Sequence, residues 1–220
     1  MERSDPPQAD QYSFVNRHCF SCGFRVTSCV LRGFCDRPRS RSRRIEHLTK
    51  FRPGEEFMRV AIMSDSHDNI WNMRKAVEIV KSSQIGLIIH CGDFIAPFML
   101  KELDEAAIPV HGVFGNNDGD QYTLTRMASD MLNNITLHGL FGDVDVDGFR
   151  IGFTHYYEMG NGLVAAGDCR LVCFGHSHVH EVKRAGDVTL LNPGEIMGKE
   201  GSPGFCFVDT ETTAIERVDL

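Results

Sequence analysis

Several apolar runs of this sequence end in the same way, at a short segment of glycine, aspartate, asparagine, serine or histidine. Four runs stop at residues 64–67, 92–93, 115–116 and 175–178, and a fifth stops at Thr154 and His155. In open α/β sheets, the loops at the carboxyl ends of the strands line the binding crevice. One end of a sheet would therefore gather two aspartates, one asparagine and four histidines. No other feature of the chain constrains its fold as strongly.

From Met58 onward, the sequence predicts strands that alternate with helices and then a half that is richer in strands. The first helix places Ile70, Met73 and Val77 on one face, and Asp68 or Asn69 can cap it. The expected strands are 58–64, 85–91, 110–114, 135–137, 140–146, 149–154, 170–174, 179–184, 188–191, 204–209 and 214–218. Further helices are expected at 97–105, 122–132 and, as a short piece, near 162–166. This order fits an α/β fold of two packed sheets with helices outside.

Length and charge limit what the chain can be. Its 220 residues can form one ordinary domain with little left over. The formal net charge of −7 argues against a surface built for nucleic acid or anionic membrane. No run of about 18 apolar residues predicts a membrane span.

The first 57 residues differ from the rest in charge. They hold 11 Lys/Arg and 7 Asp/Glu, whereas residues 58–220 hold 12 and 23. We expect residues 1–57 to form a poorly structured basic arm, either an upstream extension of the gene model or a real tail. The stretch 37–44 could be a nucleic-acid arm, although a solvated tail is the more common role of such a run. The arm lacks the pattern of a secretory signal, which predicts a cytoplasmic protein.

The eight cysteines follow the same division. Four crowd the arm, where they could bind zinc, although their irregular spacing favours a disordered extension. The other four lie in apolar runs of the body, where we expect small, buried, reduced side chains. The arm cysteines are Cys19, Cys22, Cys29 and Cys35, and the body cysteines are Cys91, Cys169, Cys173 and Cys206.

The polar residues at the strand ends have the composition of a metal site. In extended backbone, residues i and i+2 share a face, which would bring Asp65 to His67 and His176 to His178. Mixed oxygen and imidazole ligands suit transition metals better than calcium. Seven donors are too many for one tetrahedral zinc but fit two cations that share a carboxylate, about 3.5–4 Å apart. The expected ligands are Asp65, His67, Asp93, Asn116, His155, His176 and His178.

The charge of such a site suggests its reaction. Two divalent cations carry four positive charges, and two aspartates and a bridging hydroxide offset three of them. The remaining positive charge would attract a phosphate ester and stabilise its transition state. Coordination lowers the pKa of water to roughly 7, which supplies a hydroxide nucleophile at neutral pH.

The order of these segments resembles the calcineurin-like metallophosphoesterase superfamily. Asp-x-His, Gly-Asp, Gly-Asn-Asn-Asp, His and Gly-His-x-His follow one another at similar spacing over residues 58–218. The opening at residues 64–69 and the later Asn-Pro-Gly at 192–194 are similar to the small prokaryotic phosphodiesterase branch. The resemblance implies a four-layer αββα sandwich and a phosphodiesterase with two divalent cations, manganese first, with nickel, iron, zinc, cobalt or magnesium as alternatives.

The resemblance also implies a role for each residue. One cation falls to Asp65, His67 and His178, a second to Asn116, His155 and His176, and Asp93 bridges the two. The expected catalytic residues are Asp93, Asn116, Asn117 and Asp118. Many larger members carry a histidine at the position of Asn117, which assists the leaving group. Asn117 could instead contact a phosphate oxygen, and Asp118 could orient a ligand.

The sequence is also compatible with two other functions. The same site could hydrolyse phosphomonoesters or nucleotides, or the fold could be a non-catalytic protein-binding scaffold. Tyr156 and Tyr157 could stack on a substrate base or pack at the sheet edge. The expected partner is a small phosphate ester, with no membrane and no firm signal for nucleic acid. A homo-oligomer is also left open.

Overall fold

The computed structural model describes residues 17–18, 25–26 and 58–220. The chain divides into two units, residues 1–48 and 49–220. In the first, β1 (Arg17–His18) pairs antiparallel with β2 (Arg25–Val26). The hypotheses of a zinc site at Cys19, Cys22, Cys29 and Cys35 and of a poorly structured arm lie outside the described residues.

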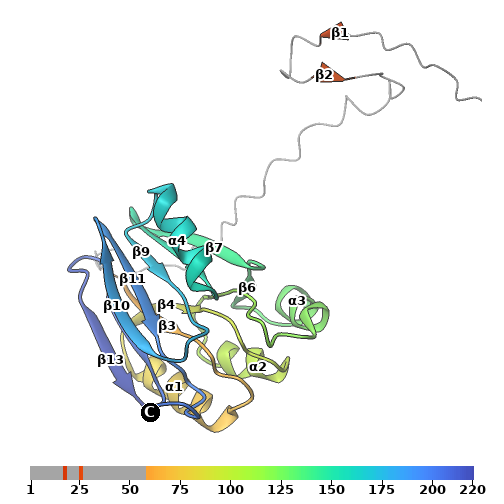
Figure 1. Ribbon diagram of the computed structural model, residues 1–220. Helices are drawn as coiled ribbons and strands as arrows, with labels where there is room; N and C mark the ends of the chain where they lie inside the picture. The colour runs from red at the N-terminus through yellow and green to blue at the C-terminus, as the bar shows by residue number, and fades with distance from the viewer. Residues whose placement is uncertain (1–16, 19–24, 27–57) are drawn as a thin grey trace, which may run out of the picture. The chain divides into compact units, whose positions relative to one another are not determined.

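The second unit contains two mixed β-sheets (Figure 1). The six-stranded sheet runs β13 (Ile215–Asp219), β12 (Gly204–Asp209), β3 (Arg59–Met63), β4 (Ile85–His90), β5 (Val110–Gly112), β6 (Ile135–Leu137). The five-stranded sheet runs β10 (His180–Ala185), β11 (Val188–Pro193), β9 (Leu171–Cys173), β8 (Phe149–Thr154), β7 (Phe141–Val146). Strands β3 to β6 are parallel, as are β8, β9 and β11, so their carboxyl ends share an edge in each sheet.

Three apolar cores separate four layers. The first packs α1 (Ile70–Ser82), α2 (Phe98–Asp104) and α3 (Gln121–Asp130) on the outer face of the six-stranded sheet. The second lies between the two sheets. The third lies under α4 (Tyr157–Ala166) on the outer face of the five-stranded sheet. The four-layer αββα sandwich expected from the sequence is therefore confirmed.

Strand β3 shows how its sequence separates two of these cores. Val60 and Ile62 face the second sheet, whereas Ala61 and Met63 face the helices, and all four are fully buried. Successive side chains of a strand point to opposite faces, so an uninterrupted apolar run fits a sheet that is covered on both sides. The strand expected at 58–64 is confirmed as β3, and its uninterrupted apolar run is explained by cover on both faces.

The helices agree with the sequence except in α4. Asn69 caps α1, and its side chain accepts a hydrogen bond from the Asn72 N–H at 3.1 Å. Helix α4 begins at Tyr157, several residues before the short helix expected near 162–166. Gly160 and Gly162 weaken the helical pattern, because glycine is a poor helix former. Gly160 is nevertheless buried against the sheet, and Leu163 and Val164 pack on the third core, so tertiary packing stabilises the helix.

Among the described residues, no helix is long and apolar enough to cross a membrane. The four body cysteines are buried and free, as expected.

Candidate metal centre

Five loops at the carboxyl ends of five strands carry the residues expected to bind metal. Three of these strands belong to the six-stranded sheet and two to the other sheet. Strand β3 leads to Asp65 and His67, β4 to Asp93, β5 to Asn116, β8 to His155, and β9 to His176 and His178. The site is thus assembled from both sheets, and the expectation that one end of a single sheet gathers all seven residues is wrong.

The backbone of these loops differs from the expectation. Asp65, His67, Asp93, His176 and His178 all have positive φ, between 44° and 69°. The extended geometry assumed for the i and i+2 pairs is therefore wrong, although Asp65 and His67 still come together. Non-glycine residues rarely adopt this left-handed conformation, and such strain gathers at functional sites. These φ values differ from the expectation because the backbone turns after each strand instead of continuing in the extended conformation.

Backbone hydrogen bonds hold the curled loops against one another. The Asp65 N–H donates to the Gly92 carbonyl at 3.1 Å, and the His67 N–H donates to the Asp93 carbonyl at 2.8 Å. The His176 N–H donates to the Asp65 carboxylate at 3.1 Å and so joins the two sheets. These bonds replace the ladder contacts that end with the strands, and they over-determine the strained conformation.

Two glycines allow this close approach. A Cβ on Gly115 would overlap the carboxylate of Asp93, and one on Gly175 would overlap the side chains of Ser64 and Asp65. Only glycine therefore allows the loops to approach one another at these two positions.

A first group of metal donors consists of Asp65, His67 and His178, whose ligand atoms lie within 4.8 Å of one another. The His178 Nε2 lies 3.6 Å from the Asp65 Oδ1. The His67 Nε2 is buried and has no hydrogen-bond partner among the described residues. A buried polar atom without a partner is costly, so it marks a place where a ligand is expected.

A second group consists of Asp65, Asp93 and His155, again within 4.8 Å. The His155 Nδ1 lies 2.8 Å from the Cys91 carbonyl, to which it must donate its hydrogen. In a neutral ring the His155 Nε2 is then a lone-pair acceptor, yet it faces the Asn116 Oδ1 at 3.0 Å. Two acceptors that face each other at this distance are suited to a shared cation.

The remaining predicted residue joins this second group through Asn116. The His176 Nδ1 lies 2.8 Å from the Asn116 Oδ1. Asp93 lies between the two groups, with its Oδ2 at 3.7 Å from the His67 Nε2 and 3.5 Å from the His155 Nε2. All seven predicted side chains are therefore brought together.

Burial shapes the charge of the donors. It raises the pKa of Asp65 to about 7, and the nearby Asp93 carboxylate adds to the rise. It also lowers the pKa of His67 and of His155, so these rings are neutral and present lone pairs. Burial also opposes protonation of His178, but its hydrogen bond to Glu195 and the Asp65 charge outweigh this effect and raise the pKa of His178. Neutral rings at His67 and His155 beside crowded carboxylates are donors that divalent cations fit on chemical grounds.

A second layer of residues supports Asp93. The Asn117 backbone N–H and side-chain amide donate to its two carboxylate oxygens at 2.8 and 2.7 Å. The Asp118 carboxylate accepts from the backbone N–H groups of Asp93, Ile95 and Gly115. Asp118 thus holds the loops after β4 and β5 in place.

Sequence reasoning missed two groups that touch the donors. One is the Cys91 carbonyl, which no side-chain pattern can reveal. The other is Glu195, fully buried, whose Oε2 lies 2.7 Å from the His178 Nδ1. A signal for Glu195 was present, because it is a carboxylate that follows an apolar strand like the other site residues.

The two tyrosines that follow His155 lie in different surroundings. The Tyr156 ring lies 5.0 Å from that of His155 and 5.3 Å from that of His176, so it borders the site. Tyr157 instead packs on Phe174 at 5.3 Å. Four further histidines of the described residues belong to neither donor group, and these are His90, His111, His138 and His180.

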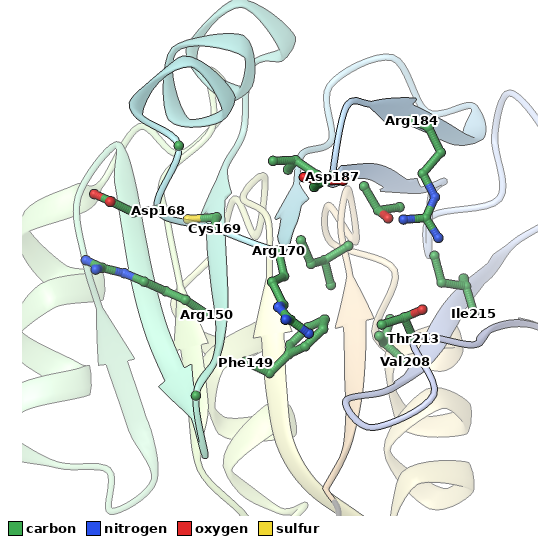
Figure 2. A pocket seen from close by; sticks show the side chains of 15 residues that line it. Phe149, Arg150, Asp168, Cys169, Arg170, Arg184, Asp187, Val208, Thr213 and Ile215 are labelled. Carbon is green, nitrogen blue, oxygen red and sulfur yellow. The ribbon is translucent and has the colours of Figure 1, made fainter.

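A cavity of about 540 Å³ lies elsewhere in the same unit. Figure 2 shows its labelled side chains, which include Phe149, Arg170 and Arg184. Its lining contains the first residues of β8, β9 and β11, at the opposite ends of those strands from the candidate metal donors. None of the predicted site residues lines it.

Comparisons with known proteins agree with this geometry. Residues 58–213 match the model of the calcineurin-like phosphoesterase superfamily domain. Phosphodiesterase MJ0936 of Methanocaldococcus jannaschii is 33% identical over 166 residues, which are 74% of this chain and 99% of the relative. A structure described as a novel archaeal phosphodiesterase superposes with a TM-score of 0.69 at 31% identity, over 74% of this chain and 100% of that one.

A more distant structure shares the fold alone. Vps29 of Chaetomium thermophilum superposes with a TM-score of 0.56 at 18% identity, over 73% of this chain and 97% of that one.

Proposed function

The chain belongs to the calcineurin-like phosphoesterase superfamily, and we propose that it is a phosphodiesterase that works with two divalent cations held between its sheets. The two relatives described as phosphodiesterases support the reaction class. The proposed substrate is a small phosphate diester.

The position of Asp93 is the observation that carries this proposal. Its Oδ2 lies between the His67 Nε2 and the His155 Nε2, one from each donor group, at 3.7 and 3.5 Å. These separations exceed hydrogen-bond lengths, but they suit atoms that share a cation between them. A carboxylate placed in this way can bridge two cations.

We assign the first cation to Asp65, His67 and His178. The second is assigned to Asn116, His155 and His176, and Asp93 is the bridge. Manganese is the proposed metal, because mixed carboxylate, amide and imidazole donors suit first-row transition metals. Two such cations supply positive charge for an anionic phosphate and lower the pKa of a coordinated water to about 7.

The chain's own residues fix this arrangement. Asn117 holds both oxygens of Asp93, and Asp118 holds the backbone of the loops around it. Because the Asn117 amide donates to Asp93 and is a poor proton donor, it does not protonate a leaving group. The site therefore favours diesters whose leaving group departs without help.

Matched substrates test the preference for diesters. Bis(4-nitrophenyl) phosphate and 4-nitrophenyl phosphate release the same leaving group, so their kcat/KM values compare the ester class alone. We expect the diester to be favoured by at least about tenfold, which corresponds to about 1.4 kcal/mol of transition-state stabilisation.

A preference for the monoester would support the phosphomonoesterase alternative. Absence of hydrolysis of either ester and of nucleotide esters, with manganese bound, would refute the enzyme proposal altogether.

Replacing His155 by alanine tests the ligand assignment. We expect the purified variant to retain about one equivalent of metal instead of two, because the first donor group is left intact. Elemental analysis after removal of free metal gives the number. Retention of both cations would show that His155 is not a ligand.

Two wider proposals accompany this function. We propose a cytoplasmic location, which the buried free thiols of the body support, because such thiols persist in reducing compartments. We also propose that the catalytic unit begins near Met58, where the family match begins, and that residues 1–57 are an extension. The intact mass of the native protein tests the second proposal.

A further inference from the structure

Glu195 is a buried acidic residue that the proposed reaction leaves without a role. It follows β11 by two residues, and its exposed fraction is 0%. A carboxylate almost never lies fully buried unless it is paired. Its partners therefore indicate why it is there.

Both oxygens of Glu195 are occupied. The Oε2 lies 2.7 Å from the His178 Nδ1, and the Oε1 accepts from the N–H groups of Glu200 and Gly201 at 2.6 Å each. Two backbone N–H groups that donate to one oxygen stabilise the negative charge of a buried carboxylate. The other oxygen, Oε2, therefore faces His178 as an acceptor.

An acceptor at this position determines the tautomer of His178. Because a carboxylate has no hydrogen to give, the His178 Nδ1 must carry one. In the neutral ring the Nε2 then bears the lone pair, and it lies 3.6 Å from the Asp65 Oδ1 in the first donor group. His155 is oriented in the same way, but by the neutral Cys91 carbonyl.

Glu195 also belongs to a segment that contacts the loop after β3. The Ile196 N–H donates to the Ser64 carbonyl at 3.1 Å, and the Met197 N–H donates to the Asp65 carbonyl at 3.0 Å. The segment after β11 thus contacts Asp65 through the Met197 backbone and His178 through the Glu195 side chain.

We propose that Glu195 is a positioning residue, which fixes His178 in the Nδ1–H form and so completes the first metal site. The inference rests on the proposed function, because it assigns a role within the same metal centre. Carboxylates behind a metal-binding histidine orient the ring, and their loss typically lowers metal affinity by about 10- to 100-fold.

The substitution Glu195→Gln separates this role from simple packing. The amide has the same shape, but its single oxygen cannot accept from the two backbone N–H groups and from His178 together. Its NH2 group requires an acceptor, which the His178 Nδ1 provides only in the Nε2–H form. We expect the variant to bind about one equivalent of manganese under conditions where the wild type binds two.

Nitrogen NMR of the histidine side chains shows directly which ring nitrogen carries the hydrogen. In metal-free wild-type protein, we expect His178 to carry its hydrogen on Nδ1, and in Glu195→Gln we expect it on Nε2. The wild-type spectrum alone can overturn the proposal, so the test holds even if the variant does not fold. A wild-type His178 with its hydrogen on Nε2 would refute the role of Glu195.

Glu200→Gln is the matched control. The Glu200 charge also raises the pKa of His178, but within the described part of the chain its side chain makes no hydrogen bond to that ring. We expect this variant to bind two equivalents and to keep the Nδ1–H form. If Glu195→Gln also binds two equivalents with wild-type affinity, the proposal fails, whereas a wild type without metal would refute the proposed function instead.

Discussion

Replacing Asp93 by alanine is expected to abolish hydrolysis of an activated phosphate diester, with a loss in kcat of at least about a thousandfold. Removing one preorganised group that stabilises transition-state charge costs roughly 10²–10³ in rate. Asp93 contacts both donor groups and is held by Asn117, so its loss disturbs both proposed cations. The measurement is the hydrolysis of bis(4-nitrophenyl) phosphate at saturating manganese.

Asp143→Ala provides the control for this substitution. Asp143 is an exposed aspartate on β7 that pairs with Arg150, and it belongs to neither donor group. It should leave the rate near that of the wild type. An Asp93→Ala protein that folds and keeps even a tenth of the activity would show that a bridging carboxylate is not required.

Manganese is expected to raise the melting temperature of chelator-treated protein by roughly 10–20 °C at a free concentration about 100 times the dissociation constant. At that concentration each site adds about 2.7 kcal/mol of stability, and two sites add about 5. For a domain of this size, 1 kcal/mol shifts the melting temperature by roughly 2–4 °C. The buried carboxylates and the unpartnered His67 Nε2 are the groups that gain most from the cations.

The concentration dependence of this shift identifies its cause. Binding to the native state predicts a melting temperature that keeps rising with the logarithm of free manganese. The Asp93→Ala protein should show a much smaller rise. Equal shifts in the two proteins would mean that manganese binds somewhere other than between the donor groups.

Much of the fold could be predicted from the sequence, because the residues of each strand face two different cores. The apolar run at 58–64 contains both Ile62, which packs on the second sheet, and Met63, which packs on the helices. Such runs mark doubly covered strands. Helix α4 was the exception, because Gly160 and Gly162 weaken the helical pattern, whereas packing of Leu163 and Val164 on the third core stabilises the helix.

The members of the candidate metal centre were also predictable, but their local geometry was not. Polar residues at the ends of neighbouring parallel strands meet within each sheet, but the packing of the two sheets that joins both sets could not be read from the strand ends. The positive φ angles of Asp65 and His67 could not be inferred, because they depend on hydrogen bonds between loops distant in sequence. The Cys91 carbonyl was hidden for the same reason, since every residue has a carbonyl.

Glu195 also corrects the charge count made from the sequence. The count of cations, aspartates and hydroxide left one positive charge at the site. Glu195 lies against His178 and adds a negative charge next to the ligands. Attraction of an anionic ester would therefore depend on the local field of the bound cations rather than on the net charge of the site.

The central claim is that the seven side chains hold a pair of cations. Anomalous X-ray scattering from crystals grown with manganese tests it most directly, because it locates the metal itself. The account predicts two peaks about 3.5–4 Å apart, one on each side of the Asp93 carboxylate. A single peak, or none among these side chains at saturating manganese, would contradict it.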